Sequence, residues 1–199
     1  MNLAVLVSGG GTNLQAILDA DLPVRVVVSN RKRAFGLERA RRAGVPAEVV
    51  SHRGFPSRED HDAAVVTALR RHGVDTVALA GFMRIVTPTL LDAFPGRVVN
   101  IHPALCPAFP GLHAQRQALE HGARVTGATV HFVDAGVDTG AIIIQGAVPV
   151  LDDDDEASLS ARVLEVEHRI YPEALRLLGA GRLTVKGRRV RIKQLEGPR

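Results

Sequence analysis

Short apolar runs alternate with helical segments over most of this chain, and this alternation limits the possible folds more than any other feature of the sequence. The first run, Asn2–Val7, is almost continuously apolar, which is typical of a strand buried on both faces of a parallel sheet. Strands separated by helices favour a parallel sheet with right-handed crossover connections. We therefore expect an α/β fold with a mostly parallel central sheet, organised as a single domain over residues 1–199.

The remaining elements follow from apolar periodicity, turn residues and capping residues. Further strands are expected at Val24–Val28, Ala47–Val50, Thr76–Leu79, Val98–His102, Thr126–Val133 and Ile142–Val150. Helices are expected at Leu14–Leu18, Gly36–Arg42, Arg58–Arg71, from Thr87-Pro88, at Gln115–Glu120 and at Ala157–Leu178. Ser57 is the expected N-cap of the third helix, and the acidic run Asp152–Glu156 is expected to form the N-terminus of the last one. Leu183–Val185 and Val190–Ile192 predict a small C-terminal hairpin.

Two polar residues, Asn100 and His102, interrupt the apolar strand that begins at Val98. They are two residues apart, so both side chains leave the same face of the strand, and Pro103 ends that strand directly after them. The carboxyl ends of strands in open α/β sheets are where ligands bind. An amide N–H can stabilise an oxyanion and an imidazole can transfer a proton, a pair that suits acyl transfer without a covalent intermediate. The alternative is that both residues only cap the strand end.

The glycine-rich turn Ser8–Asn13 follows the first strand and opens a helix, a layout that binds anions through backbone N–H groups. A dinucleotide fingerprint would need a third glycine where Leu14 stands and an acidic residue where Ser29-Asn30 stands. The Gly-Lys-Ser/Thr of a Walker loop is also absent. These comparisons leave a single sugar phosphate, held by the backbone together with Thr12 and Asn13, or else a tight turn with no ligand.

The charge of the chain is unevenly distributed. The net charge is +4, and residues 182–199 alone carry +6. Such a tail could bind nucleic acid, but no aromatic residues interleave its charges for base stacking, so we expect a solvated terminal hairpin and no nucleic-acid partner. No apolar run reaches the roughly 18 residues needed to cross a bilayer, and the N-terminus lacks the basic region of a signal peptide. The expected location is the cytoplasm, with no membrane partner.

Few residues in the sequence could act as metal ligands or as a nucleophile in place of Asn100 and His102. No His, Cys and acidic residues have the spacing of a zinc site, so no metal is expected. The single cysteine, Cys106, lies in a proline-flanked loop with no evident base and is expected to pack and not to act as a nucleophile. His131 alternates with apolar neighbours, and we expect a hydrogen-bonded strand histidine and not a ligand-facing one.

Six short motifs, in this order, make the chain resemble the phosphoribosylglycinamide formyltransferases, the folate-dependent enzymes of purine synthesis. The motifs are Ser8–Ala16, Ala34–Ala40, Ala80–Ile85, Asn100–Pro103, Pro110–His113 and Glu167–Pro172. Each alone is weak, but six in order are specific, and the resemblance covers nearly the whole chain. It implies a three-layer Rossmann-like domain that acts on small molecules without a metal, as a monomer or a homodimer.

The resemblance also implies roles for single residues. The amine of glycinamide ribonucleotide would attack the formyl carbon of 10-formyltetrahydrofolate, the co-substrate. Asn100 would hold the oxyanion, His102 would transfer the proton, and Asp138 would pair with His102 and raise its pKa. The substrate phosphate would bind Gly11, Thr12 and Asn13, and Glu167 would hold its ribose or glycinamide end. Folate would contact Arg58, Phe82, Met83, Arg84, Ile85, Val86 and Asn100, with the loop Asp134–Asp138 closing over it.

The chain departs from the family pattern in three places, one of which is the acidic run Asp152–Asp155, which is denser than expected of the family. It also has Ala104-Leu105-Cys106-Pro107 where the family usually has Ser-Leu-Leu-Pro, and Leu164 at a position that is often polar. The change at Ala104–Pro107 touches no proposed chemical group, so we expect it to tune the loop only, whereas Leu164 weakens the assignment of a sugar-phosphate contact near the last helix. A formyltetrahydrofolate hydrolase, which shares the Asn, His and Asp, is the alternative function, although family hydrolases usually carry an additional N-terminal regulatory domain. A nucleic-acid binder that uses the basic tail is a third.

Overall fold

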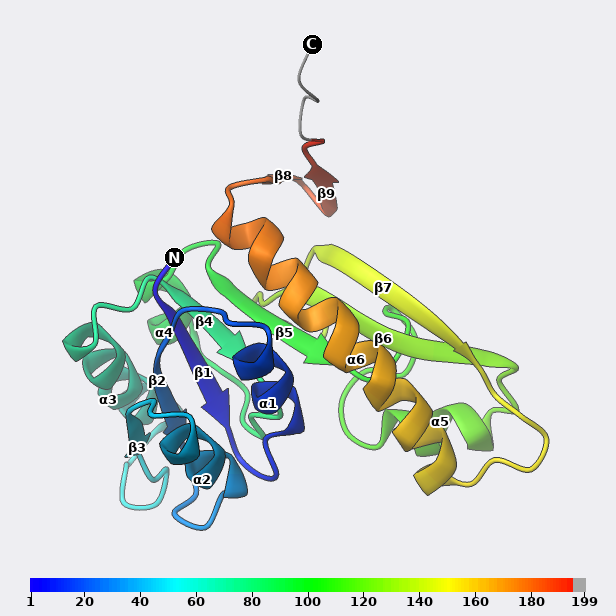
Figure 1. Ribbon diagram of the computed structural model, residues 1–199, viewed down its shortest axis with the longest axis horizontal. Helices are drawn as coiled ribbons and strands as arrows, with labels where there is room; N and C mark the ends of the chain where they lie inside the picture. Colours follow the sequence, from blue (N-terminus) through cyan, green and yellow to red (C-terminus); the bar gives the residue numbers. More distant parts are fainter. Residues whose placement is uncertain (195–199) are drawn as a thin grey trace.

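The structure is a computed structural model that describes residues 1–194. Its strands are β1 (Leu3–Val7), β2 (Val24–Ser29), β3 (Ala47–Val49), β4 (Thr76–Leu79), β5 (Val98–His102), β6 (Val125–Phe132), β7 (Ile142–Pro149), β8 (Leu183–Lys186) and β9 (Arg189–Ile192) (Figure 1). Its helices are α1 (Thr12–Asp19), α2 (Phe35–Arg42), α3 (Arg58–Arg71), α4 (Pro88–Ala93), α5 (Ala114–Glu120) and α6 (Glu156–Gly179). The expected elements are all present, and their ends differ from the expected ones by two residues at most.

The strands form one sheet in the order β3-β2-β1-β4-β5-β6-β7-β9-β8. The pairs from β3 to β5 are parallel, whereas β6 is antiparallel to both β5 and β7. The chain leaves β1 toward β2 on one side and later returns to β4 on the other, which makes the carboxyl ends of β1 and β4 a topological switch point. The expected α/β fold with a mostly parallel sheet and a C-terminal hairpin, β8–β9, is confirmed.

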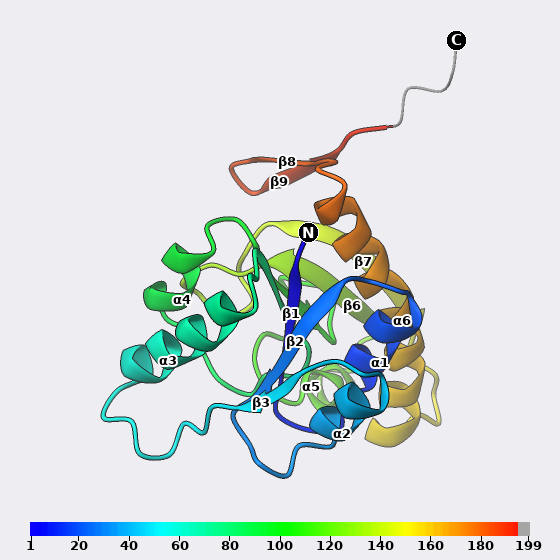
Figure 2. The ribbon, with the colours of Figure 1, turned by 60° about the vertical axis from the view of Figure 1, so that its left-hand side comes forward.

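Helices cover both faces of the sheet and produce the expected three layers. Figure 2 shows α1, α2 and α6 on one face of the sheet and α3 and α4 on the other. Each face has its own apolar cluster, one centred on residues such as Val5, Leu14 and Leu175, the other on Leu6, Leu69 and Leu90. Every residue of β1 is buried, because this strand lies inside the sheet and is covered from both sides. No helix within residues 1–194 has the length and apolarity needed to cross a bilayer.

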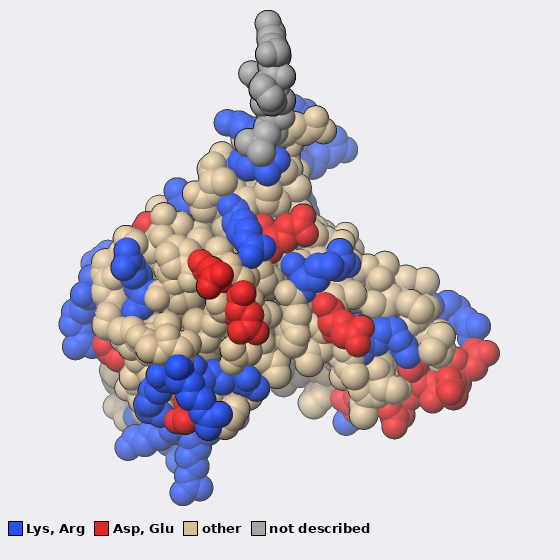
Figure 3. Space-filling model, viewed as in Figure 1, with Lys and Arg blue, Asp and Glu red and all other residues tan. Residues whose placement is uncertain are grey.

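Local capping explains why two helices begin where the sequence predicts. The Ser57 hydroxyl accepts a hydrogen bond from the Asp60 N–H at 3.0 Å, so α3 begins at the expected residue. At α6, Asp155 and Ser158 form a reciprocal capping box. The acidic run therefore forms a helix N-terminus, as expected, and Figure 3 shows acidic side chains gathered at that end of α6.

Gly11 joins β1 to α1 and also touches the first turn of α2. Its φ of 70° lies in the left-handed region, and a Cβ there would lie 2.7 Å from the Gly36 Cα. Replacing Gly11 with alanine is expected to destabilise the fold by about 2–4 kcal/mol, because left-handed backbone and a clash with fixed backbone both oppose the added methyl group. Urea unfolding would measure this loss.

Gly10 is the matched control for this substitution. A Cβ at Gly10 meets nothing within 4 Å, and its φ is not in the left-handed region. Gly10→Ala should therefore unfold close to the wild-type urea concentration. Equal unfolding free energies for the two alanine variants would show that the close approach between Gly11 and Gly36 is not needed.

Candidate active site

Asn100, His102 and Asp138 come together at the carboxyl end of β5. Asn100 and His102 leave the same face of this strand, and Asp138 lies in the loop between β6 and β7. The Asn100 Nδ2 donates to Asp138 Oδ1 at 3.3 Å, and the other carboxylate oxygen lies 3.3 Å from His102 Nδ1. The Gly111 N–H donates to that same oxygen at 2.9 Å. A carboxamide, an imidazole and a carboxylate that are distant in the sequence thus share one site.

Both nitrogens of the His102 ring face oxygen atoms. Its Nε2 lies 2.8 Å from the carbonyl oxygen of Phe109, and its Nδ1 faces the Asp138 carboxylate. A neutral ring carries one N–H and can donate to only one of these oxygens, whereas the doubly protonated ring can donate to both. The ring of His102 is therefore oriented by an oxygen atom at each of its two nitrogens.

His131 is a fourth member of the site. Its Nδ1 donates to the Phe132 carbonyl oxygen at 2.8 Å, and its Nε2 lies 3.3 Å from Asn100 Nδ2 and 3.5 Å from Asp138 Oδ1. The expectation of a hydrogen-bonded strand histidine that does not face the ligand is thus only half right, because His131 also lines the cavity. The antiparallel register of β5 and β6 places it directly opposite Asn100, a pairing that the sequence of β6 alone does not indicate.

The surroundings of Asp138 favour its ionised form. Burial by itself would raise the pKa of this carboxyl group. The contact with the His131 ring, the hydrogen bond from the Gly111 N–H and the nearby charge of His102 outweigh burial and lower the pKa below its usual range. Asp138 therefore presents a negative charge to both imidazoles at neutral pH.

A cavity of about 570 Å³ opens beside these groups. Its walls include five consecutive residues that the resemblance assigned to folate, the three polar groups, and most of the loop Asp134–Asp138: Phe82, Met83, Arg84, Ile85, Val86, Asn100, His102, Asp134, Gly136, Val137 and Asp138. Met83 and Ile85 are about half exposed, as befits walls of an open cleft. Arg58, the first residue of α3, is exposed and is not among the lining residues, so its contact with folate stays a prediction.

A second pocket, of about 240 Å³, lies at the glycine turn and adjoins the first. It is lined by Ser8, Gly9, Gly10, Gly11, Thr12, Asn13, Arg31, Ala80, Gly81 and Met83. Gly81 and Met83 line both pockets, so ligands in the two would meet near the end of β4. The expected phosphate-binding residues Gly11, Thr12 and Asn13 are therefore together in a hollow next to the polar groups.

Glu167 lies behind this pocket and does not line it. The carboxylate, on α6, accepts a hydrogen bond from Asn13 Nδ2. Burial raises the pKa of Glu167 despite this hydrogen bond. In this structure Glu167 thus orients Asn13, and a direct contact with the ribose or glycinamide stays a prediction.

Two buried polar contacts that the sequence did not reveal hold the walls of the pockets. The Ser8 hydroxyl accepts from the Met83 N–H at 2.8 Å and donates to Asn30 Oδ1 at 2.6 Å, which ties the glycine turn to the loop that follows β4. Asp62 on α3 accepts from the N–H and the hydroxyl of Thr87, at the far end of that loop. Both contacts join distant segments, so no local pattern in the sequence indicates them.

The structure offers little support for other chemistry at this site. Within residues 1–194, no three His, Cys, Asp or Glu side chains gather in a group that could hold a metal ion. Burial raises the pKa of the Cys106 thiol, and the charge of Asp138 adds to this effect. The thiol therefore stays protonated, in accord with a packing role.

Comparisons with known proteins agree with this geometry. Residues 1–175 match the family described as formyl transferase. The phosphoribosylglycinamide formyltransferase of Escherichia coli K12 is 46% identical over 189 residues, which are 92% of this chain and 89% of that protein. A crystal structure of glycinamide ribonucleotide transformylase 1 from Symbiobacterium toebii has 58% identity and a TM-score of 0.96, covering 98% of this chain and 94% of that chain.

A longer relative matches over the same region. The trifunctional purine biosynthetic protein adenosine-3 of Drosophila melanogaster is 50% identical over 90% of this chain. The chain spans only 14% of the length of that protein. The shorter bacterial relatives, by contrast, are covered almost completely. This chain therefore belongs to the phosphoribosylglycinamide formyltransferase family of formyl transferases.

Proposed function

We propose that the protein transfers the formyl group of 10-formyltetrahydrofolate to the amine of glycinamide ribonucleotide, a step of purine biosynthesis. The observation that carries the proposal is the meeting of two adjoining pockets beside Asn100, His102 and Asp138. The larger pocket is apolar enough for a pterin ring, and the smaller has the backbone donors for a phosphate. The proposed substrates are small metabolites, and we place the reaction in the cytoplasm.

The proposed reaction proceeds by direct attack. The amine nitrogen attacks the formyl carbon, and the carbonyl oxygen becomes an oxyanion that the Asn100 Nδ2 stabilises. The long contacts of that amide, 3.3 Å to both Asp138 and His131, can be exchanged for the oxyanion. The bond from the formyl carbon to N10 of the folate then breaks, the amine loses a proton, and N10 gains one. His102 carries that proton, and Asp138 stabilises the charged ring.

Holding both substrates supplies the rest of the rate enhancement. A phosphate anchored at the glycine turn and a pterin anchored beside Phe82 and Val86 leave the two reacting groups next to each other. Such alignment converts a bimolecular step into one that is effectively unimolecular. No covalent enzyme intermediate is needed, in keeping with the protonated state of the Cys106 thiol.

The test is an assay with both substrates. Purified protein mixed with glycinamide ribonucleotide and 10-formyltetrahydrofolate should release tetrahydrofolate, and omitting either substrate should stop the reaction. Release of formate without glycinamide ribonucleotide would instead identify a formyltetrahydrofolate hydrolase. No turnover at micromolar enzyme would reject the proposed transfer.

A further inference from the structure

Among residues 1–194, Arg31 is the one charged residue that lines the smaller pocket. It follows Asn30 in the loop between β2 and α2 and lines the pocket together with the glycine turn. The other walls of this pocket are backbone, hydroxyl, amide and apolar groups, which carry no net charge. A phosphate bound only by those groups would have no positively charged side chain beside it to balance its negative charge.

The backbone of Arg31 is held in place, and its side chain is unengaged. The Arg31 N–H donates to the Ser29 hydroxyl at 3.0 Å, and the Ala34 N–H donates to the Arg31 carbonyl oxygen at 3.2 Å. Within residues 1–194 the guanidinium itself makes no hydrogen bond and no ion pair shorter than 4.0 Å. Its donors are therefore available to a ligand, on a turn whose position is set.

The other arginine beside the glycine turn, Arg39, has a different role. Its Nε donates to the Gly10 carbonyl oxygen at 2.9 Å, and its Nη1 donates to the Gln15 side chain at 3.0 Å. Its guanidinium also lies over the Phe35 ring, 5.1 Å from the centroid. Arg39 thus fixes the turn from outside, which leaves Arg31 as the unengaged cation at the pocket in the part of the chain that the structure describes.

We propose that Arg31 binds the substrate phosphate together with the glycine turn and makes the site prefer a phosphorylated glycinamide to its unphosphorylated form. The proposal rests on the proposed function. A guanidinium matches two phosphate oxygens with two parallel N–H donors, and such charge-assisted hydrogen bonds are stronger than neutral ones. The phosphate does not react, so this contact anchors the substrate and takes no part in proton transfer.

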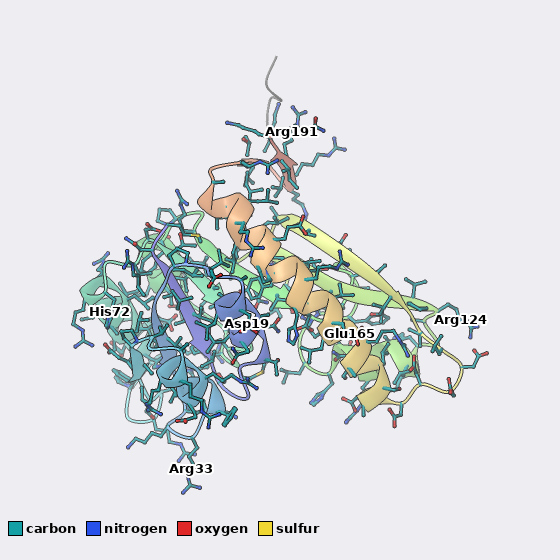
Figure 4. All side chains as sticks on the ribbon, in the orientation of Figure 1. Asp19, Arg33, His72, Arg124, Glu165 and Arg191 are labelled. Carbon is teal, nitrogen blue, oxygen red and sulfur yellow. The ribbon has the colours of Figure 1, made fainter. Side chains whose placement is uncertain are left out.

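The chain provides a matched control in Arg33. This residue lies two positions away on the same loop, is exposed, and carries the same charge. It does not line the pocket, and Figure 4 shows it pointing away from the body of the protein. Basic residues gather over this loop and α2 (Figure 3), so comparing Arg31→Ala with Arg33→Ala separates a direct contact from the general positive field.

The experiment measures steady-state kinetics of both alanine variants and of Arg31→Lys. Arg31→Ala is expected to raise KM for glycinamide ribonucleotide by about 10- to 100-fold, the range expected for losing hydrogen bonds to a charged group. Its kcat and its KM for the folate should stay near the wild-type values. The KM of Arg31→Lys should lie between those of the wild type and Arg31→Ala, because lysine keeps the charge and lacks the two parallel N–H donors. The KM of Arg33→Ala should stay within about twofold of the wild-type value. With the unphosphorylated riboside as substrate, Arg31→Ala should match the wild type.

Three results would overturn the proposal. The first is an equal KM for the two alanine variants. The second is a rise in KM of Arg31→Ala that disappears at high salt together with that of Arg33→Ala. The third is an equal rise in KM of Arg31→Ala when the substrate is the unphosphorylated riboside. Calorimetry with ribose 5-phosphate decides the matter if the wild type shows no turnover. Weaker binding by Arg31→Ala alone would then support the phosphate site while the proposed function fails, whereas equal binding, or no binding by the wild type, would overturn the proposal.

Discussion

Replacing His102 with alanine is expected to lower kcat by about 10²- to 10⁴-fold, the usual contribution of a positioned general acid or base. The KM values for both substrates should change little. The reason is geometric, since His102 lines the larger pocket at the end of β5, while the anchoring residues lie in the glycine turn and in the loop around Phe82. Steady-state kinetics with each substrate varied in turn would measure both parameters.

His72 provides a control for the loss of an imidazole. It follows α3, lies at the edge of the molecule in Figure 4 and lines neither pocket, and its Nε2 contacts Glu48 at 2.6 Å. His72→Ala should therefore keep the wild-type kcat. A His102→Ala enzyme with kcat within a few-fold of the wild type would remove His102 from the proton route and would leave alignment of the substrates as the main source of rate enhancement.

The parts of the fold with local signals were predictable from the sequence. α3 begins after Ser57 and ends where expected because a side-chain cap and an apolar periodicity mark it. β5 ends at His102 because Pro103 cannot continue the ladder. Asn100 and His102 could be assigned to the same face of β5 from the sequence alone, because side chains two positions apart on a strand point to the same side.

The parts that depend on contacts between distant segments were not predictable in this way. His131 joins the site only because β6 runs antiparallel to β5, and no pattern within β6 indicates which residue lies opposite Asn100. Asp138 was identified by resemblance and not by spacing, since it lies in an irregular loop. Arg31 was missed because one exposed arginine in a basic loop has no distinguishing pattern until the glycine turn is folded against it.

Asp138→Asn is expected to lower kcat by at least about 100-fold while changing the shape of the site very little. An asparagine side chain keeps the size of Asp138 and can still accept the hydrogen bond from the Gly111 N–H. It removes the negative charge that lies 3.3 Å from His102 Nδ1, so the charged imidazole loses its stabilising partner. KM values near those of the wild type, with a reduced kcat, are the expected kinetic result.

The same substitution tests the charge of Asp138 through protein stability. Because the pKa of Asp138 is lowered in the folded protein, its ionised form stabilises the fold above the unfolded pKa of about 4, and this stabilisation is lost as the pH falls through the lower folded value. Asp138→Asn should therefore cost most stability near neutral pH and progressively less below about pH 4. Urea unfolding of both proteins from pH 7 to pH 3 would measure the difference. A difference that stays constant over this range, together with an unchanged kcat, would mean that Asp138 contributes shape and not charge.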